Sequence, residues 1–132
     1  MNAPQVAIGL GLRGGASAAA IVALVEAALA QARGLAPHID FAQASLVTVD
    51  SKRDEPGLHE AAALLRRELV FISRAALIDA GAGVATRSKL SQKHYGVGSV
   101  AEAAALAGAG PDARLLVKRI ARDGVTCAVT AG

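Results

Sequence analysis

The sequence predicts an α/β fold, a three-layer α/β/α sandwich with a mixed, mainly parallel sheet and a C-terminal β-hairpin. Three observations support this. Short apolar runs alternate with segments of helical periodicity, which is typical of a parallel sheet covered by helices on both faces. Two extended runs near the C-terminus flank an Asp-Gly pair, a strong hairpin signal. The length of 132 residues suits one domain, so we expect residues 1–132 to form a single unit.

The first half of the chain alternates strand and helix patterns. A strand is predicted over residues 5–10, followed by a helix over 18–33 that Ser17 caps and Gly34 ends. A second strand is predicted over residues 45–49. After it we expect a charged loop over residues 50–57 and a helix over 58–67 with an apolar stripe.

The second half continues the alternation and then changes to a hairpin. The segments expected there are a strand over 69–72, a helix from the Ser73 cap to residue 80, an exposed connection over 84–95, a helix over 100–107, and hairpin strands over 115–120 and 125–130. The connection is expected because residues 84–95 are basic and show little apolar periodicity.

Composition limits the classes of function. The chain is 53% hydrophobic but only 2% aromatic, so its core must be aliphatic. The net charge of +3 suits an anionic small molecule as well as it suits nucleic acid. We expect no nucleic-acid partner because no basic run is interleaved with aromatic residues. The single Cys127 has no disulfide or zinc partner, and we expect it to be buried in a strand.

The same considerations predict a soluble, cytoplasmic protein. No basic region precedes an apolar run at the start of the chain, so no secretory signal is expected. The most apolar segment, residues 16–32, is too short for a good membrane span and is interrupted by Glu26 and Gln31. His59 and Glu60 lack the second histidine of a zinc protease motif. We therefore expect no membrane association, no metal site and no cofactor.

The pattern G-x-G-x-x-G occurs at Gly9, Gly11 and Gly14. It is open to three interpretations: a glycine turn without function, an anion site formed by helix N–H groups and Arg13, or a dinucleotide loop. The dinucleotide interpretation is the least favoured. The acidic Asp50 lies well beyond the usual spacing of about 20 residues, and an arginine is unusual in a pyrophosphate turn.

Several basic residues fall where loops of an open α/β sheet converge. We expect Arg13, Lys52, Arg53, Lys118 and Arg119 at strand ends or in the final hairpin, where they could hold carboxylates. For Lys118 an exposed position within a strand is an equal alternative. His94 and Tyr95 could touch a ligand, but a surface position is the favoured interpretation.

Two acidic motifs are open to a functional or a capping role. Lys52, Asp54 and Glu55 could form an acid/base cluster, although an acid before Pro56 is also typical of a helix start. Lys52 and Glu55 are thus candidate catalytic residues. Ser99 and Glu102 have the spacing of a capping box, which we favour over catalysis.

Four ordered stretches resemble one known family. They are GLRGG with Gly11, Arg13 and Gly15; VDSKRDEPGL with Asp50, Lys52 and Glu55; GVGSVAEAAAL with Gly96, Ser99, Val100 and Glu102; and LVKR with GVTCAV, holding Lys118, Thr126 and Ala128. Together they resemble the cobalamin-biosynthesis CobE/CbiG C-terminal domain family over nearly the whole chain. The chain starts at the first shared strand, so it is most similar to the free-standing members of the aerobic pathway. It departs from the family at Gly98, where proline is frequent, and before Lys118, where proline is absent.

The resemblance implies a role in building the corrin ring. The leading hypothesis is binding of an anionic precorrin, as a carrier or as a partner of other pathway enzymes, by a monomer or weak homodimer. The candidate ligand-binding residues are Arg13, Gly14, Gly15, Lys52, Asp54, Glu55, Gly98, Ser99 and Lys118. The first alternative is an enzyme acting on a precorrin, since CbiG members of the family open a lactone. In that enzyme Lys52 would be the electrophile and Glu55 or Asp54 the base. The second alternative is a nucleotide- or phosphate-binding domain.

Overall fold

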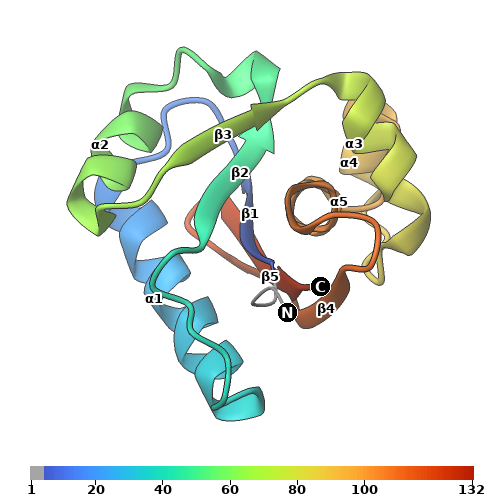
Figure 1. Ribbon diagram of the computed structural model, residues 1–132. Coiled ribbons are helices and arrows are strands. Elements are labelled where there is room, and N and C mark those ends of the chain that lie inside the picture. The colour runs from blue at the N-terminus through green and yellow to red at the C-terminus, as the bar shows by residue number, and fades with distance from the viewer. Residues whose placement is uncertain (1–4) are drawn as a thin grey trace.

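Five strands form one mixed sheet that lies between two layers of helices (Figure 1). The computed structural model describes residues 5–132. The strands are β1 (Val6–Leu12), β2 (Ser45–Val49), β3 (Leu69–Ile72), β4 (Arg114–Arg122) and β5 (Val125–Ala131). The helices are α1 (Ala18–Leu35), α2 (Pro56–Leu65), α3 (Arg74–Ala80), α4 (Lys89–Tyr95) and α5 (Val100–Ala109), with 3-10 turns η1 (Asp50–Lys52) and η2 (Gly81–Gly83).

The strand order is β3-β2-β1-β5-β4. Strands β1, β2 and β3 are parallel, and β5 is antiparallel to both of its neighbours, so β4 runs in the direction of β1. Helices α1 and α2 cover one face of the sheet and α3, α4 and α5 lie on the other (Figure 1). The predicted three-layer α/β sandwich with a C-terminal hairpin is therefore confirmed.

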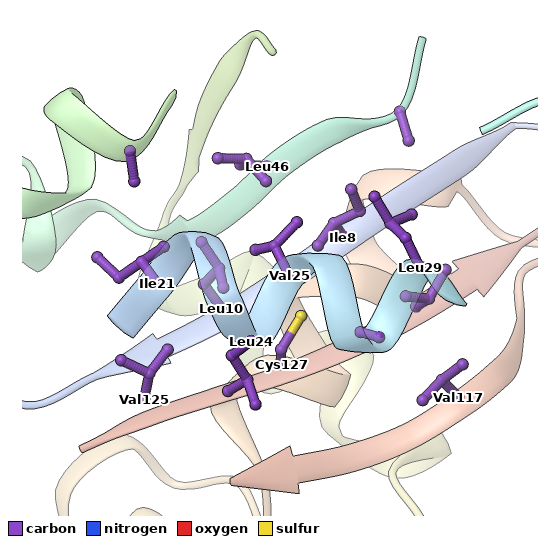
Figure 2. Packing of buried hydrophobic residues seen from close by; sticks show 14 of the residues in the cluster. Ile8, Leu10, Ile21, Leu24, Val25, Leu29, Leu46, Val117, Val125 and Cys127 are labelled. Carbon is purple, nitrogen blue, oxygen red and sulfur yellow. The ribbon is translucent and has the colours of Figure 1, made fainter. Parts of the chain in front are cut away.

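The face covered by α1 holds the larger side chains (Figure 2). Ile8 and Leu10 of β1 contact a buried stripe on α1, because alternate residues of a strand point to the same face. The buried residues of α1 recur at helical spacing and are Ala18, Ile21, Leu24, Val25, Ala28, Leu29 and Ala32. Ser17 caps this helix as predicted, since its hydroxyl accepts a hydrogen bond from the Ala20 N–H at 3.1 Å.

The opposite face brings α5 against the backbone of β1. Gly9 and Gly11 lie inside the strand, which continues to Leu12 beyond the predicted end. A Cβ atom at Gly9 would overlap the Ala101 carbonyl and lie 2.8 Å from the Ala105 Cβ. These glycines therefore allow close helix packing and form no phosphate loop, so the dinucleotide interpretation of G-x-G-x-x-G is wrong.

Other element boundaries also differ from the prediction. Helix α1 continues through Gly34 to Leu35, and α2 begins at Pro56 rather than Leu58. The predicted connection over 84–95 contains the helix α4, which buries none of its residues and therefore has no apolar stripe to detect. By length and composition alone α1 could cross a membrane, although the structure packs its apolar stripe on the sheet.

Candidate functional site

A cavity of about 820 Å³ opens at the edge of the sheet where the parallel strands β1 and β2 end. The residues that follow these strands form one wall, and the β4–β5 hairpin forms a second. Helix α4, Arg74 at the start of α3 and Val100 at the start of α5 complete the lining. Ligands of open α/β sheets bind at this end of the strands.

The lining is rich in positive charge. It includes five Lys or Arg residues, which are Arg13, Lys52, Arg74, Arg119 and Arg122. Against them stand two carboxylates, Asp50 and Asp123. An opening with this excess of cations raises the local concentration of anions and offers several donors to carboxylate or phosphate oxygens.

The hairpin turn fixes the position of Arg13. Asp123 and Gly124 have φ values of 54° and 79°, the left-handed conformation that a two-residue hairpin turn requires. The Gly124 carbonyl accepts a hydrogen bond from the Arg13 N–H at 2.9 Å. The predicted Asp-Gly turn therefore ties the end of β1 to the hairpin that carries Arg122.

Arg13 and Lys52 lie in the same cavity, as the shared strand edge predicted. The other candidate residues of the two loops lie outside its lining, and they are Gly14, Gly15, Arg53, Asp54 and Glu55. The Glu55 carboxylate accepts a hydrogen bond from the Gly15 N–H at 3.1 Å and makes no capping hydrogen bond to α2. Glu55 thus joins the loop after β1 to the start of α2, and its predicted side-chain capping role is wrong.

Gly98, Ser99 and Lys118 also lie outside the cavity lining. Gly98 is buried, and its carbonyl accepts a hydrogen bond from the Ser88 N–H at 2.7 Å. The Ser99 hydroxyl caps α5 by accepting from the Glu102 N–H at 3.2 Å. Lys118 is exposed on the edge strand β4.

Glu102 has a role that the capping-box motif did not predict. Its fully buried carboxylate accepts hydrogen bonds from the backbone N–H groups of Ala85, Thr86 and Arg119 at 2.7–2.8 Å and from the Thr86 hydroxyl at 2.7 Å. Burial alone would raise the pKa of Glu102, but these hydrogen bonds outweigh it and hold the pKa below its ordinary value. The carboxylate therefore links the segment before α4 to the strand that carries Arg119.

Sequence reasoning missed Arg74 and Arg122 and placed Tyr95 at the surface, whereas Tyr95 is half-buried and lines the cavity with the exposed His94. A signal for both arginines was present. Arg74 follows the Ser73 cap at the end of β3, and Arg122 directly precedes the Asp-Gly turn. Both are therefore cations at the same edge as Arg13.

Cys127 is buried in β5, as predicted, and burial raises the pKa of its thiol to about 12. Within residues 5–132 no three His, Cys, Asp or Glu side chains gather closely enough to hold a metal ion.

Comparisons with known proteins agree with this fold. The sequence model described as Cobalamin synthesis G C-terminus matches residues 6–130. Protein CobE from a Sinorhizobium species is 35% identical over 122 residues, which make up 92% of this chain and 77% of that protein.

Two solved structures are also similar. One is the crystal structure of CobE, a protein from the cobalamin (vitamin B12) biosynthetic pathway, with 34% identity and a TM-score of 0.83 over 98% of this chain and 91% of that one. The other is the cobalamin biosynthesis protein chiG from Agrobacterium tumefaciens str. C58, with 34% identity and a TM-score of 0.65 over 95% and 96% of the two chains. The chain therefore belongs to the CobE/CbiG C-terminal family of cobalamin biosynthesis proteins.

Proposed function

We propose that the protein binds an anionic precorrin in the cavity at the carboxyl ends of β1 and β2. The observation that carries this proposal is the set of five basic side chains around one opening in a protein of cobalamin biosynthesis. Precorrins carry acetate and propionate carboxylates around the rim of a large ring. Arginine is well suited to such a rim, because its planar guanidinium can bind a carboxylate through two hydrogen bonds.

The size of the cavity supports a ligand of this class. Its volume of about 820 Å³ lies near the upper end of the roughly 300–1,000 Å³ found for small-molecule sites. The cations also come from several walls rather than from one patch. Arg13 and Lys52 follow two neighbouring strands, and Arg122 lies on the hairpin. Carboxylates on different sides of one ring can therefore be bound at the same time.

The enzyme hypothesis gains no comparable support. It requires Lys52 and either Glu55 or Asp54 to act on the same ligand, but both acids lie outside the cavity lining. The Glu55 carboxylate is directed to the Gly15 N–H instead. Among the described residues that line the cavity, no hydrogen-bonded pair of a nucleophile and a base is found. We therefore propose a carrier that holds the intermediate between enzymes of the pathway, with no change to its bonds.

The purified protein can be incubated with a panel of precorrins and separated from free pigment by gel filtration at low salt. We expect at least one precorrin to co-elute and to keep its mass after release. A change of mass would overturn the carrier role in favour of an enzyme. Failure of every precorrin to co-elute would overturn the proposed function itself.

The cavity residues can be tested with Arg13→Ala, Lys52→Ala and the matched Lys118→Ala. We expect Arg13→Ala to weaken precorrin binding by about 1–3 kcal/mol, the range of a charge-assisted hydrogen bond, and the effect to shrink at high salt. Lys52→Ala should act in the same direction and leave the melting temperature nearly unchanged. Lys118 is exposed outside the cavity, so its removal should leave the affinity unchanged. Equal losses at Lys118 and Arg13 would show that the cavity is not the binding site.

A further inference from the structure

Helix α4 is attached to the molecule differently from the other helices. None of its residues is buried, whereas each of the other α-helices buries at least one side chain. Yet this segment gives the cavity five lining residues, which are Ser88, Leu90, Ser91, His94 and Tyr95. Helix α4 is therefore a wall of the cavity that is held to the core by the half-buried Tyr95 at its C-terminal end.

The apolar residues of this wall face a basic cavity. Leu90 lines the cavity while 58% of its surface is exposed. Tyr95, five residues further along the helix, also lines the cavity but packs against the core on the α5 face. Further apolar side chains of the lining come from the strand ends, α5 and the hairpin, and they include Leu12, Val49, Val100 and Val125. The other exposed large hydrophobic residues, Leu35, Leu64 and Ile78, do not line it. The cavity thus combines its five cations with apolar side chains, of which Leu90 on α4 is the exposed one.

The segment that carries α4 is fixed at both ends. Before the helix, the N–H groups of Ala85 and Thr86 are held by the buried Glu102 carboxylate. At the base, the Ser88 N–H donates to the Gly98 carbonyl at 2.7 Å, which closes residues 88–98 into a loop with its ends together. Tyr95 at the C-terminal end of α4 packs against the core, but no side chain of the helix is fully buried. The N-terminal part of α4, which carries Leu90, can therefore shift against the cavity without unpacking the core.

We infer that the N-terminal part of α4 is a lid whose Leu90 lies against the face of the bound tetrapyrrole ring, with Tyr95 as its fixed end, while the cations hold the carboxylate rim of the ring. The inference rests on the proposed function and adds a basis for selectivity. A large ring offers an apolar face that the lid covers, and covering it removes the Leu90 side chain from water. An open-chain polycarboxylate offers charge without such a face. The lid therefore selects rings among polyanions.

The test compares two polyanions, uroporphyrin as the ring and hexaglutamate as the open chain, by calorimetry at one salt concentration. We expect Leu90→Ala to weaken uroporphyrin binding about tenfold, the scale of one partly buried leucine, and to change hexaglutamate binding less than twofold. The matched control is Leu64→Ala on α2, where 65% of the leucine surface is exposed away from the cavity. It should leave both affinities unchanged. Because Leu90 is exposed, Leu90→Ala should keep the wild-type melting temperature.

Hydrogen exchange gives a second measurement. Uroporphyrin should slow amide exchange over residues 89–95 of the wild-type protein, and hexaglutamate should not. Wild-type uroporphyrin affinity in Leu90→Ala, or exchange over 89–95 that uroporphyrin leaves unchanged, would overturn the lid while leaving the proposed function intact. If the wild-type protein binds neither uroporphyrin nor any precorrin, the proposed function fails and the lid fails with it.

Discussion

The two faces of the sheet are packed in opposite ways. On the α1 face, Ile8 and Leu10 interlock with long aliphatic side chains such as Ile21 and Leu24 (Figure 2). On the α5 face, Gly9 removes the side chain and lets the helix backbone approach the strand directly. Long side chains can rearrange after a substitution, whereas two backbones in contact cannot. Packing on the α5 face therefore fixes the position of α5 relative to β1, and the α1 face supplies most of the large buried side chains.

This difference matters for the site because α5 begins at the cavity. Val100 at its first turn lines the cavity, and Glu102 in the same turn holds the segments on both sides. A shift of α5 along β1 would move both residues. The positions of Val100 and Glu102 at the site therefore depend on Gly9, which has no side chain and fixes α5 against β1.

The largest expected effect is that of Gly9→Val. Its Cβ would lie 2.6 Å from the Ala105 nitrogen, which belongs to the helix backbone and cannot rotate away. We expect a loss of about 4 kcal/mol or more in the free energy of unfolding, measured with urea. A loss below about 1 kcal/mol would show that α5 can move away from β1, and would remove the contrast between the faces.

A smaller loss is expected for Ile21→Ala on the α1 face. Ile21 is fully buried, so its truncation leaves a cavity that the neighbouring side chains fill in part. We expect a loss of about 3 kcal/mol in urea unfolding with precorrin affinity unchanged. A large loss of affinity in the folded variant would show that the α1 face also positions the site.

Glu102→Gln tests the link between α5 and its neighbours. The amide replaces one carboxylate oxygen by an NH₂ group, which then faces N–H and O–H donors. We therefore expect the free energy of unfolding to fall by about 2 kcal/mol at neutral pH. The pKa of Glu102 is lowered in the folded state, so its contribution is complete above the ordinary value of 4.5 and is lost as the pH falls through the folded pKa. The stability difference between wild type and variant should therefore shrink below about pH 4.5. A constant difference across this range would contradict the role of the ionised carboxylate.

The smallest effect is that of Gly34→Ala, the matched glycine control for Gly9. Gly34 lies within α1, and no atom lies within 4 Å of the position of an added Cβ. We expect the free energy of unfolding, measured with urea, to rise by about 0.5–1 kcal/mol, because alanine favours the helix and restricts the unfolded chain. A loss at Gly34 would show that glycine substitutions destabilise this protein for reasons other than contact with α5.

Much of the fold could be predicted because its signals are local. Ser17, Ser73 and Ser99 each cap a helix through a hydrogen bond to an N–H three residues on, and Asp123-Gly124 forms the hairpin turn. The shared edge of Arg13 and Lys52 followed from the parallel order of the strands. Such features need only a few adjacent residues or one rule of topology.

The remaining features depend on contacts between distant segments. In the sequence Gly9 and Gly11 match a loop motif. The structure shows that they lie within strand β1, where α5 packs against them. The partners of Glu102 come from a loop and an edge strand, which its spacing to Ser99 cannot reveal. Helix α4 escaped prediction because a helix without buried residues has no period in its apolar positions.

The burial of Cys127 makes its thiol a natural reporter of unfolding of the protein. It is the single cysteine of the chain, and it lies in the core between β5 and α1 (Figure 2). With the thiol pKa raised to about 12, almost no reactive thiolate exists in the folded state at neutral pH. Alkylation of the thiol therefore reports unfolding events without the need for an engineered cysteine. A precorrin that stabilises the folded state should slow that reaction in proportion to its occupancy of the cavity.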